Sequence, residues 1–218
     1  MAAAQTGTGK TAAFVLPMLQ KMIEEPTLYQ KRVPRVLVLT PTRELAAQVG
    51  ETILSLGKDL GVRSAVVFGG VGINPQKAAI AKGLDFLVAT PGRLLDLMNQ
   101  GFAGLSKTHI LILDEADRML DMGFLPDLKR ILKALPPDRQ TLLFSATFSP
   151  EIKKLASEFL NKPESVEIER NKDSSLVRQT LYRVPKANKH TVLRDLIVDN
   201  QWDQVLVFTR TKYGADKL

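Results

Sequence analysis

The first residues whose types and spacing could do chemistry lie in the segment AQTGTGKT at positions 4–11. Gly7 and Gly9 allow the backbone to curl closely around an anion, because glycine has no Cβ to collide with it. Lys10 can place a positive charge on nucleotide phosphates, and the Thr11 hydroxyl can ligate Mg²⁺. The alternative is a flexible turn that caps a helix starting near Lys10. Because the GKT residues directly open an apolar helical pattern, we favour a phosphate site.

Two adjacent carboxylates, Asp114 and Glu115, end an apolar run in the segment HILILDEAD at 109–117. Ligands of open α/β sheets bind beyond the carboxyl ends of the strands. An aspartate there can hold Mg²⁺ beside a phosphate loop, and a neighbouring glutamate can deprotonate a water that attacks a γ-phosphate. Taken alone, the pair could also be an acidic helix start, since carboxylates are favoured at the positive end of a helix. Together with the loop at 4–11, it favours a nucleotide-hydrolysing site.

The elements that must position these residues are short apolar runs that alternate with helical patterns. The runs do not alternate apolar with polar residues, so both faces of each strand are expected to be buried, as in a parallel sheet. This order predicts an α/β fold with right-handed crossovers. Predicted strands cover 35–40, 64–70, 85–90, 109–117, 141–147 and 165–169; predicted helices cover 42–60, 75–83, 91–100, 125–135 and 149–160, the last with Ser149 as its N-cap.

The composition changes in the last quarter of the chain. The segment 170–179 is polar and is predicted to be a linker. A helix at 186–200, a strand at 204–210 and the start of another helix then predict a second α/β unit, which is too small to bury a core of its own. The predicted organisation is a first domain at 1–169, a linker at 170–179 and the beginning of a second domain at 180–218.

The overall charge and composition narrow the class of protein. Lysines and arginines number 30 against 23 aspartates and glutamates, which gives a formal net charge of +7. This balance suits a polyanion such as nucleic acid, although a basic ATPase without such a partner is also compatible. The lack of cysteine excludes disulfides and thiolate metal sites. No apolar run approaches the roughly 18 residues of a membrane span, and the N-terminus has no signal-peptide pattern. We therefore expect a cytoplasmic protein with no membrane partner.

Six short motifs, in the expected order, make the sequence resemble the DEAD-box ATP-dependent RNA helicases of superfamily 2. They are AQTGTGKT at 4–11, PTRELA at 41–46, Gly69-Gly70, TPGR at 90–93, DEAD at 114–117 and SAT at 145–147, and VLVFTRT at 205–211 looks like the motif that follows them. That family normally has alanine where Ala4 stands. The segments FGGVGINPQ, DEADRMLDMGF and VLVFTRTK look most like the bacterial RhlE-type branch.

The resemblance implies a RecA-like parallel sheet flanked by helices, followed by the beginning of a second RecA-like domain. It implies ATP and Mg²⁺ as cofactors and RNA as the partner. Lys10 and Glu115 would be catalytic, with Glu115 as the general base. The nucleotide would contact Thr6, Gly7, Thr8, Gly9, Lys10 and Thr11, and Mg²⁺ would be served by Thr11 and Asp114. RNA would lie at Thr42, Arg43, Gly70, Thr90, Gly92 and Arg93, and Asp117, Ser145 and Thr147 would link the two sites.

The residues themselves are compatible with those RNA positions. The two motifs that carry Arg43 and Arg93 each follow a predicted strand and open a predicted helix, so their backbone N–H groups would point at an anion site. The arginines can add charge-assisted bonds to phosphates, and Gly70 and Gly92 permit close backbone approach. Each arginine could instead be a solvated cap or half of a surface pair. Nothing here is typical of base recognition, so RNA binding is expected to be largely independent of sequence.

The family pattern also predicts that this sequence is a fragment. Members of the family carry an adenine-recognising Q motif upstream of the phosphate loop, and downstream motifs with an arginine that acts on the transition state. Such an arginine contributes roughly 10³–10⁵ in rate. The expected function is an ATP-dependent RNA helicase, represented by a piece with little activity of its own. The alternative is a truncated nucleotide- or RNA-binding module. A kinase or GTPase would explain neither PTRELA nor SAT.

Overall fold

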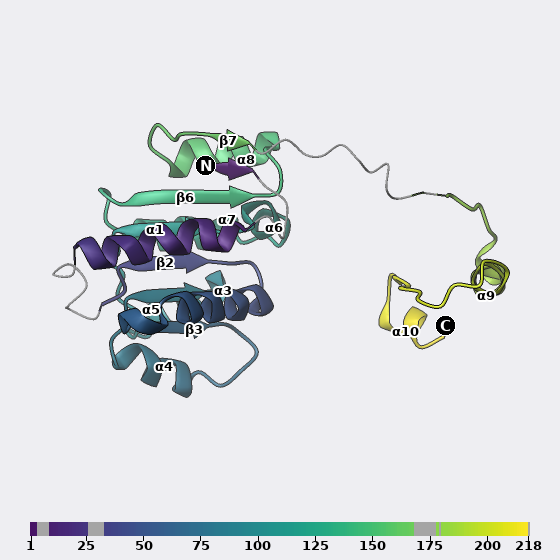
Figure 1. The fold of residues 1–218 in the computed structure, drawn as a ribbon, viewed down its shortest axis with the longest axis horizontal. Coiled ribbons are helices and arrows are strands. Elements are labelled where there is room, and N and C mark those ends of the chain that lie inside the picture. Colours follow the sequence, from purple (N-terminus) through teal and green to yellow (C-terminus); the bar gives the residue numbers. More distant parts are fainter. Residues whose placement is uncertain (4–8, 26–32, 168–177, 179, 218) are drawn as a thin grey trace. The chain divides into compact units, whose positions relative to one another are not determined.

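The computed structural model describes residues 1–3, 9–25, 33–167, 178 and 180–217 (Figure 1). The chain divides into two compact units, Met1–Arg170 and Asn171–Leu218. Of the predicted linker at 170–179, only Arg178 belongs to the described residues. The predicted domain boundaries therefore stay a prediction.

The first unit is built on a seven-stranded sheet in which all neighbouring strands are parallel (Figure 1). The strand order is β3–β4–β2–β5–β6–β1–β7. The strands are β1 (Ala2–Ala3), β2 (Val36–Leu39), β3 (Ser64–Val67), β4 (Phe86–Ala89), β5 (Ile110–Leu113), β6 (Gln140–Ser145) and β7 (Val166–Glu167). The predicted parallel α/β sheet is thus confirmed, and each strand predicted in the first unit is present with somewhat different bounds; residues 168 and 169 of the last one lie outside the described residues.

Helices cover both faces of this sheet (Figure 1). They are α1 (Lys10–Glu24), α3 (Arg43–Leu56), α4 (Asn74–Ala81), α5 (Pro91–Asn99), α6 (Ala116–Asp121), α7 (Leu125–Lys133) and α8 (Pro150–Phe159), with a 3-10 turn, η1 (Lys58–Leu60), after α3. Ser149 caps α8 as predicted, since its side chain accepts a hydrogen bond from the Ile152 N–H. Every helix predicted in the first unit is therefore confirmed within a few residues.

Two apolar cores explain why the strands are apolar throughout. Successive side chains of a strand point to opposite faces of the sheet. In β2, Val36 and Val38 pack with α1 and α3 on one face, whereas Leu37 and Leu39 belong to the core that includes α5, α7 and α8 on the other face. Because both faces are covered, no position of β2 can be polar. The sheet is consequently a rigid platform, and its polar residues gather where the strands end.

The regular structure in the described residues of the second unit is a 3-10 turn, η3 (Lys186–Asn188), and two helices, α9 (Lys189–Asp199) and α10 (Lys212–Ala215). The predicted strand at 204–210 is wrong: these residues belong to no strand, and Leu206 and Phe208 are 80% and 88% exposed. A strand exists through its hydrogen bonds to a neighbouring strand, and the described part of this unit offers none. The apolar run therefore stays outside the sheet and exposed to solvent.

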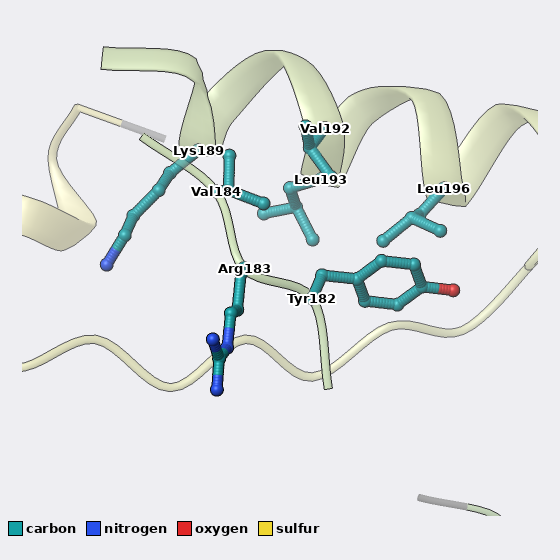
Figure 2. A pocket seen from close by; sticks show the side chains of 7 residues that line it. All are labelled: Tyr182, Arg183, Val184, Lys189, Val192, Leu193 and Leu196. Atoms are coloured by element: carbon teal, nitrogen blue, oxygen red, sulfur yellow. The ribbon is translucent and has the colours of Figure 1, made fainter. Parts of the chain in front are cut away.

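An apolar groove lies between α9 and the segment Tyr182–Val184 that precedes it. Figure 2 shows the ring of Tyr182 below Leu196 and the side chain of Val184 beside Leu193, whereas Arg183 extends away from them. The groove has a volume of about 540 Å³. Among the described residues, every buried apolar side chain belongs to the first unit. The second unit thus has an open groove in place of a closed core.

Candidate active site

The carboxyl ends of three neighbouring strands bring three of the predicted site segments to one edge of the sheet. All strands are parallel, and Leu39 at the end of β2 is in register with both Ala89 of β4 and Leu113 of β5. The next residues remain attached to the neighbouring strand: the Asp114 N–H donates to the Leu39 carbonyl at 2.9 Å, and the Thr40 N–H donates to the Ala89 carbonyl at 3.0 Å. The motifs at 41–46, 90–93 and 114–117 therefore begin side by side.

The phosphate loop is described only at its end. Ala4–Thr8 lie outside the described residues, and with them the predicted contacts of Thr6, Gly7 and Thr8. Gly9 precedes α1 with φ 83°, in the left-handed region that favours glycine. Lys10 opens α1, and its Nζ is buried without a hydrogen-bond partner in the described part of the chain. A buried ammonium group without a partner is costly, so this position is suited to an anionic ligand.

Asp114 is the buried carboxylate of the site, with an exposed fraction of only 2%. Burial raises its pKa from 3.8 to about 6; the charge of Lys10 opposes this shift, and the charge of Glu115 adds to it. Its Oδ1 accepts a hydrogen bond from the Glu115 N–H at 3.0 Å. A carboxylate that is desolvated in this way is stabilised by a cation. Asp114 and Lys10 thus occupy one electrostatic environment.

The same residues provide a test of whether Mg²⁺ fits. Mg²⁺ is commonly held by one or two carboxylates together with phosphate oxygens and water. Within the described ranges, no group of three or more His, Cys, Asp or Glu side chains could hold a metal ion by itself. The donors present are the Asp114 carboxylate and the hydroxyl of Thr11 in the first turn of α1. This set fits Mg²⁺ when nucleotide phosphates complete the ligands.

Glu115 has an unusual backbone and a specific partner. Its φ of 52° and ψ of 52° lie in the left-handed region, which non-glycine residues rarely adopt and which is typical of constrained functional positions. Its side chain is 16% exposed, and its Oε2 accepts a hydrogen bond from Nη1 of Arg118 at 3.3 Å. The sequence analysis did not include Arg118. The signal that could have found it is the i, i+3 spacing on a helix start.

Asp117 joins the DEAD segment to the SAT segment. Its Oδ2 accepts from the Ala146 N–H at 3.0 Å, and its Oδ1 accepts from the Arg118 N–H at 3.0 Å. Ser145 is fully buried, and its Oγ accepts from the Thr147 N–H at 3.3 Å. The structure therefore brings the three predicted linking residues together, whereas their role in coupling stays a prediction.

Two predicted RNA residues begin α3. The Thr42 side chain accepts a hydrogen bond from the Leu45 N–H at 3.3 Å and so caps the helix. Arg43 and Glu44 form an ion pair with each other, and both side chains are largely exposed. Arg43 is thus half of a surface pair in this structure. Its exposure still leaves it accessible to an anion.

The other predicted RNA residues surround the double-glycine loop. Gly70 has φ 82°, and a Cβ at Gly70 or Gly92 would meet no atom within 4 Å, so the chain leaves open space at both. Arg93 is 12% exposed, and its Nη2 donates to the Val71 carbonyl at 3.0 Å, which ties α5 to this loop. Thr90 is buried and precedes α5. Arg93 is therefore anchored to the protein, unlike Arg43.

A buried glutamine that the sequence analysis missed also shapes the loop. Gln76 of α4 accepts from the Phe68 N–H at 3.2 Å and donates to the Phe68 carbonyl at 3.1 Å. It thereby replaces the strand partner that β3 lacks after Val67, which explains why the predicted strand at 64–70 ends early. No pattern in the sequence separates this glutamine from an exposed one.

Comparison with known proteins places this chain in a helicase family. Residues 1–155 match the family model described as DEAD/DEAH box helicase. The chain is 42% identical to the ATP-dependent RNA helicase RhlB of Pseudomonas putida, over 96% of this chain and 54% of that protein. It is 43% identical to the ATP-dependent RNA helicase vasa of Drosophila melanogaster, over 100% of this chain and 33% of that protein. The chain thus spans from about a third to about half of these relatives.

A solved structure agrees with the sequence relatives. The crystal structure of a hypothetical ATP-dependent RNA helicase from Sulfolobus tokodaii aligns with a TM-score of 0.68 and 40% identity, over 77% of this chain and 47% of that one. This likeness identifies the sheet and its helices as a RecA-like fold. In the part of the chain that is described, no helix has the length and apolar character needed to cross a membrane.

Proposed function

The chain belongs to the DEAD/DEAH box helicase family, and from this premise we propose that the protein is an ATP-dependent RNA helicase. It would couple ATP binding and hydrolysis to RNA binding and local duplex unwinding. The observation that carries the proposal is the buried pair of Lys10 and Asp114 at one edge of the sheet, with Glu115 directly after it. That grouping provides a cation for phosphates, a carboxylate for Mg²⁺ and a second carboxylate for a water.

Each residue of the nucleotide site has a distinct role in this proposal. Bound Mg²⁺–ATP supplies the γ-phosphoryl group together with a cation that offsets the charge on its oxygens. The Lys10 ammonium would contact the β- and γ-phosphates, and Thr11 and Asp114 would hold the metal ion. Glu115 orients a water and accepts its proton. The Lys10 Nζ atom and the Asp114 side chain are both buried, so their interaction with these ligands would be little weakened by solvent.

Communication between the two sites runs through Asp117 in this proposal. Its carboxylate is shared between the N–H groups of Arg118 and Ala146. A shift of residues 145–147 therefore changes a contact of the helix that starts beside Glu115. Ser145 and Thr147 fix the shape of that segment through their own hydrogen bond.

RNA is the proposed partner, bound through its backbone. Thr42 and Arg43 begin α3, and Thr90, Gly92 and Arg93 begin α5, so two helix N-termini present N–H groups at the same sheet edge. Such contacts with phosphates carry no sequence information, which favours sequence-independent RNA binding. No membrane partner is proposed. The cytoplasm is the proposed location, because it supplies both ATP and RNA. Residues 180–218 are proposed to begin a second RecA-like domain after the linker at 170–179.

The test is steady-state phosphate release by the full-length protein with and without RNA. RNA should stimulate the wild type, and Glu115→Gln should lower turnover by about 10²–10⁴, the usual contribution of a general base, while ATP binding is retained. Glu158→Gln on α8, whose carboxylate pairs with Lys129, is the matched control and should keep wild-type turnover. A wild type that RNA does not stimulate would refute the proposed function. Normal turnover by Glu115→Gln would refute the assignment of the base.

A further inference from the structure

A basic pocket lies between α7 and α8, at the edge of the sheet where the strands begin. Arg139 directly precedes β6, and Glu158 and Phe159 stand at the end of α8. The candidate active site lies beyond the opposite ends of the strands, so the two sites are separate. The pocket has a volume of about 280 Å³, and its lining residues are Lys129, Leu132, Lys133, Arg139, Glu158 and Phe159.

Two of the three cations that line the basic pocket form no ion pair in the described part of the chain. Glu158 is the acidic residue of the lining, and its Oε2 lies 2.8 Å from the Lys129 Nζ. The ion pairs within the described ranges include neither Lys133 nor Arg139. Because two positive charges remain uncompensated, the pocket attracts an anionic group.

Arg139 gives an independent indication of an anionic ligand. Its Nη1 donates to the Pro136 carbonyl at 2.9 Å, whereas its Nε is buried and has no hydrogen-bond partner among the described residues. Burial lowers the pKa of this guanidinium, and no described carboxylate opposes the effect. Removing a cation from water without a counter-charge is costly. A guanidinium is also suited to binding a carboxylate through two parallel hydrogen bonds.

The basic pocket continues between the same two helices into a longer apolar cavity. Lys129 and Glu158 line both, and the second cavity has a volume of about 680 Å³. Ile152 and Leu155 of α8 line it and are buried, and Leu125 of α7 lines it with 36% of its surface exposed. An RNA backbone has no aliphatic groups for such a surface, whereas a peptide does. The combination of cations and apolar side chains therefore favours a peptide.

The charge of this groove changes along its length. Asp121 and Glu151 line the longer cavity and are exposed, whereas Lys133 and Arg139 line only the basic pocket. A ligand that lies along the whole groove thus meets negative charge at one end and positive charge at the other. This difference favours a peptide whose acidic residues are confined to one end and are followed by apolar residues.

We propose that the groove between α7 and α8 binds a segment of a partner protein that has acidic residues at one end and apolar residues next to them. A carboxylate of the segment would accept hydrogen bonds from Arg139 and lie beside Lys133. The apolar side chains would cover Ile152 and Leu155 and thereby leave water. Because the basic pocket is at the sheet edge opposite the proposed RNA residues, the segment and RNA can bind at the same time.

The experiment measures the binding of labelled synthetic peptides to the full-length protein by fluorescence anisotropy, without ATP. The probe is a leucine-rich peptide with glutamates at one end, made in both chain directions, and at least one of the two should bind. Replacing its glutamates by lysines should abolish binding. Replacing its leucines by serines should weaken binding by about tenfold or more, because apolar area is lost from the interface.

Substitutions in the basic pocket test where the glutamate–leucine peptide binds. Arg139→Gln should weaken its binding by about tenfold, the loss expected for a hydrogen bond between charged groups. Lys133→Gln should weaken it by about twofold to threefold, because an exposed ion pair contributes less. Arg130→Gln removes a charge from the same helix at a position that does not line the groove, and it should keep the wild-type affinity.

The controls separate docking in the groove from misfolding, from general attraction to a basic protein and from RNA binding. Thermal unfolding shows which variants are folded, and Lys133→Glu, at an exposed position, provides a charge reversal if Arg139→Gln is unfolded. Equal losses in Arg130→Gln and the pocket variants would refute the docking site, as would equal binding of the leucine and serine peptides. Displacement of the peptide by poly(U) RNA that itself requires Arg139 would assign the pocket to RNA and overturn the proposal.

Discussion

Two apolar runs of similar composition lie in opposite environments in this molecule: one is buried in the sheet and the other is exposed. ILIL at 110–113 becomes β5, lies between β2 and β6 and is almost completely buried. VLVF at 205–208 joins no strand, and its side chains are 41–88% exposed. The difference teaches that an apolar run is only a candidate strand. Its backbone N–H and C=O groups need hydrogen-bond partners on both sides before the run can be buried.

The same comparison extends to the residues that follow each run. After β5, the fixed backbone holds Asp114 in a buried position and Glu115 in a left-handed conformation. Such a conformation persists only where the surrounding structure determines it strongly. After VLVF, Thr209 makes a local hydrogen bond to the Thr211 carbonyl at 3.0 Å and stays exposed. Chemically demanding geometry is therefore found where the packing can support it.

Removing one leucine from each run gives the largest expected contrast. Leu111→Ala should lower the free energy of unfolding of the first unit by about 2–5 kcal/mol, because it leaves a cavity in a fully buried strand. Leu206→Ala, at an exposed position, should change it by no more than about 0.5 kcal/mol. Urea denaturation followed by far-UV circular dichroism measures both. Equal losses would show that the run at 205–208 is packed in solution.

The buried carboxylate after β5 should make stability depend on pH. Since burial raises the pKa of Asp114 from 3.8 to about 6 in the folded state, the folded protein binds this proton more tightly than the unfolded chain does. The contribution is stabilising below about pH 4 and is lost as the pH rises through about 6. The loss amounts to about 3 kcal/mol at most, as one pKa unit corresponds to about 1.4 kcal/mol.

Asp114→Asn removes that titration and provides the test. Without nucleotide or divalent cations, the variant should gain stability relative to the wild type between pH 5 and pH 8, in urea unfolding at several pH values. Asp121→Asn, at an exposed position on α6, is the matched control and should show no such gain. A constant difference between Asp114→Asn and wild type across this range would mean that Asp114 is solvated in the folded state.

Helix caps offer the smallest contrast between the two units. Ser149 caps α8, which buries Ile152, Leu155 and Ala156, and Thr211 caps the short α10, which buries no residue among those described. Ser149→Ala should cost about 1 kcal/mol of stability in the first unit. Thr211→Ala should leave the main thermal transition unchanged, because α10 has no packing to lose. If Ser149→Ala and Thr211→Ala lowered the melting temperature by a comparable amount, the inferred difference in packing between the units would be contradicted.

The sequence determined most local structure and the identity of the chemical groups. Uninterrupted apolar runs predicted buried parallel strands, Ser149 marked a helix start, and the order of the short motifs identified the family. These signals are local: they depend on which residues stand next to one another along the chain. The roles of the nucleotide and RNA residues remain predictions from that resemblance.

Tertiary structure alone decided which distant residues meet. The nearness of Lys10 to Asp114 and the contact of Asp117 with Ala146 both depend on the strand order β3–β4–β2–β5–β6–β1–β7. The failure of the predicted strand at 204–210 has the same origin. Hydrogen bonds between strands and the burial of charges join segments that are far apart in sequence. The local periodicity of the sequence therefore cannot predict these contacts.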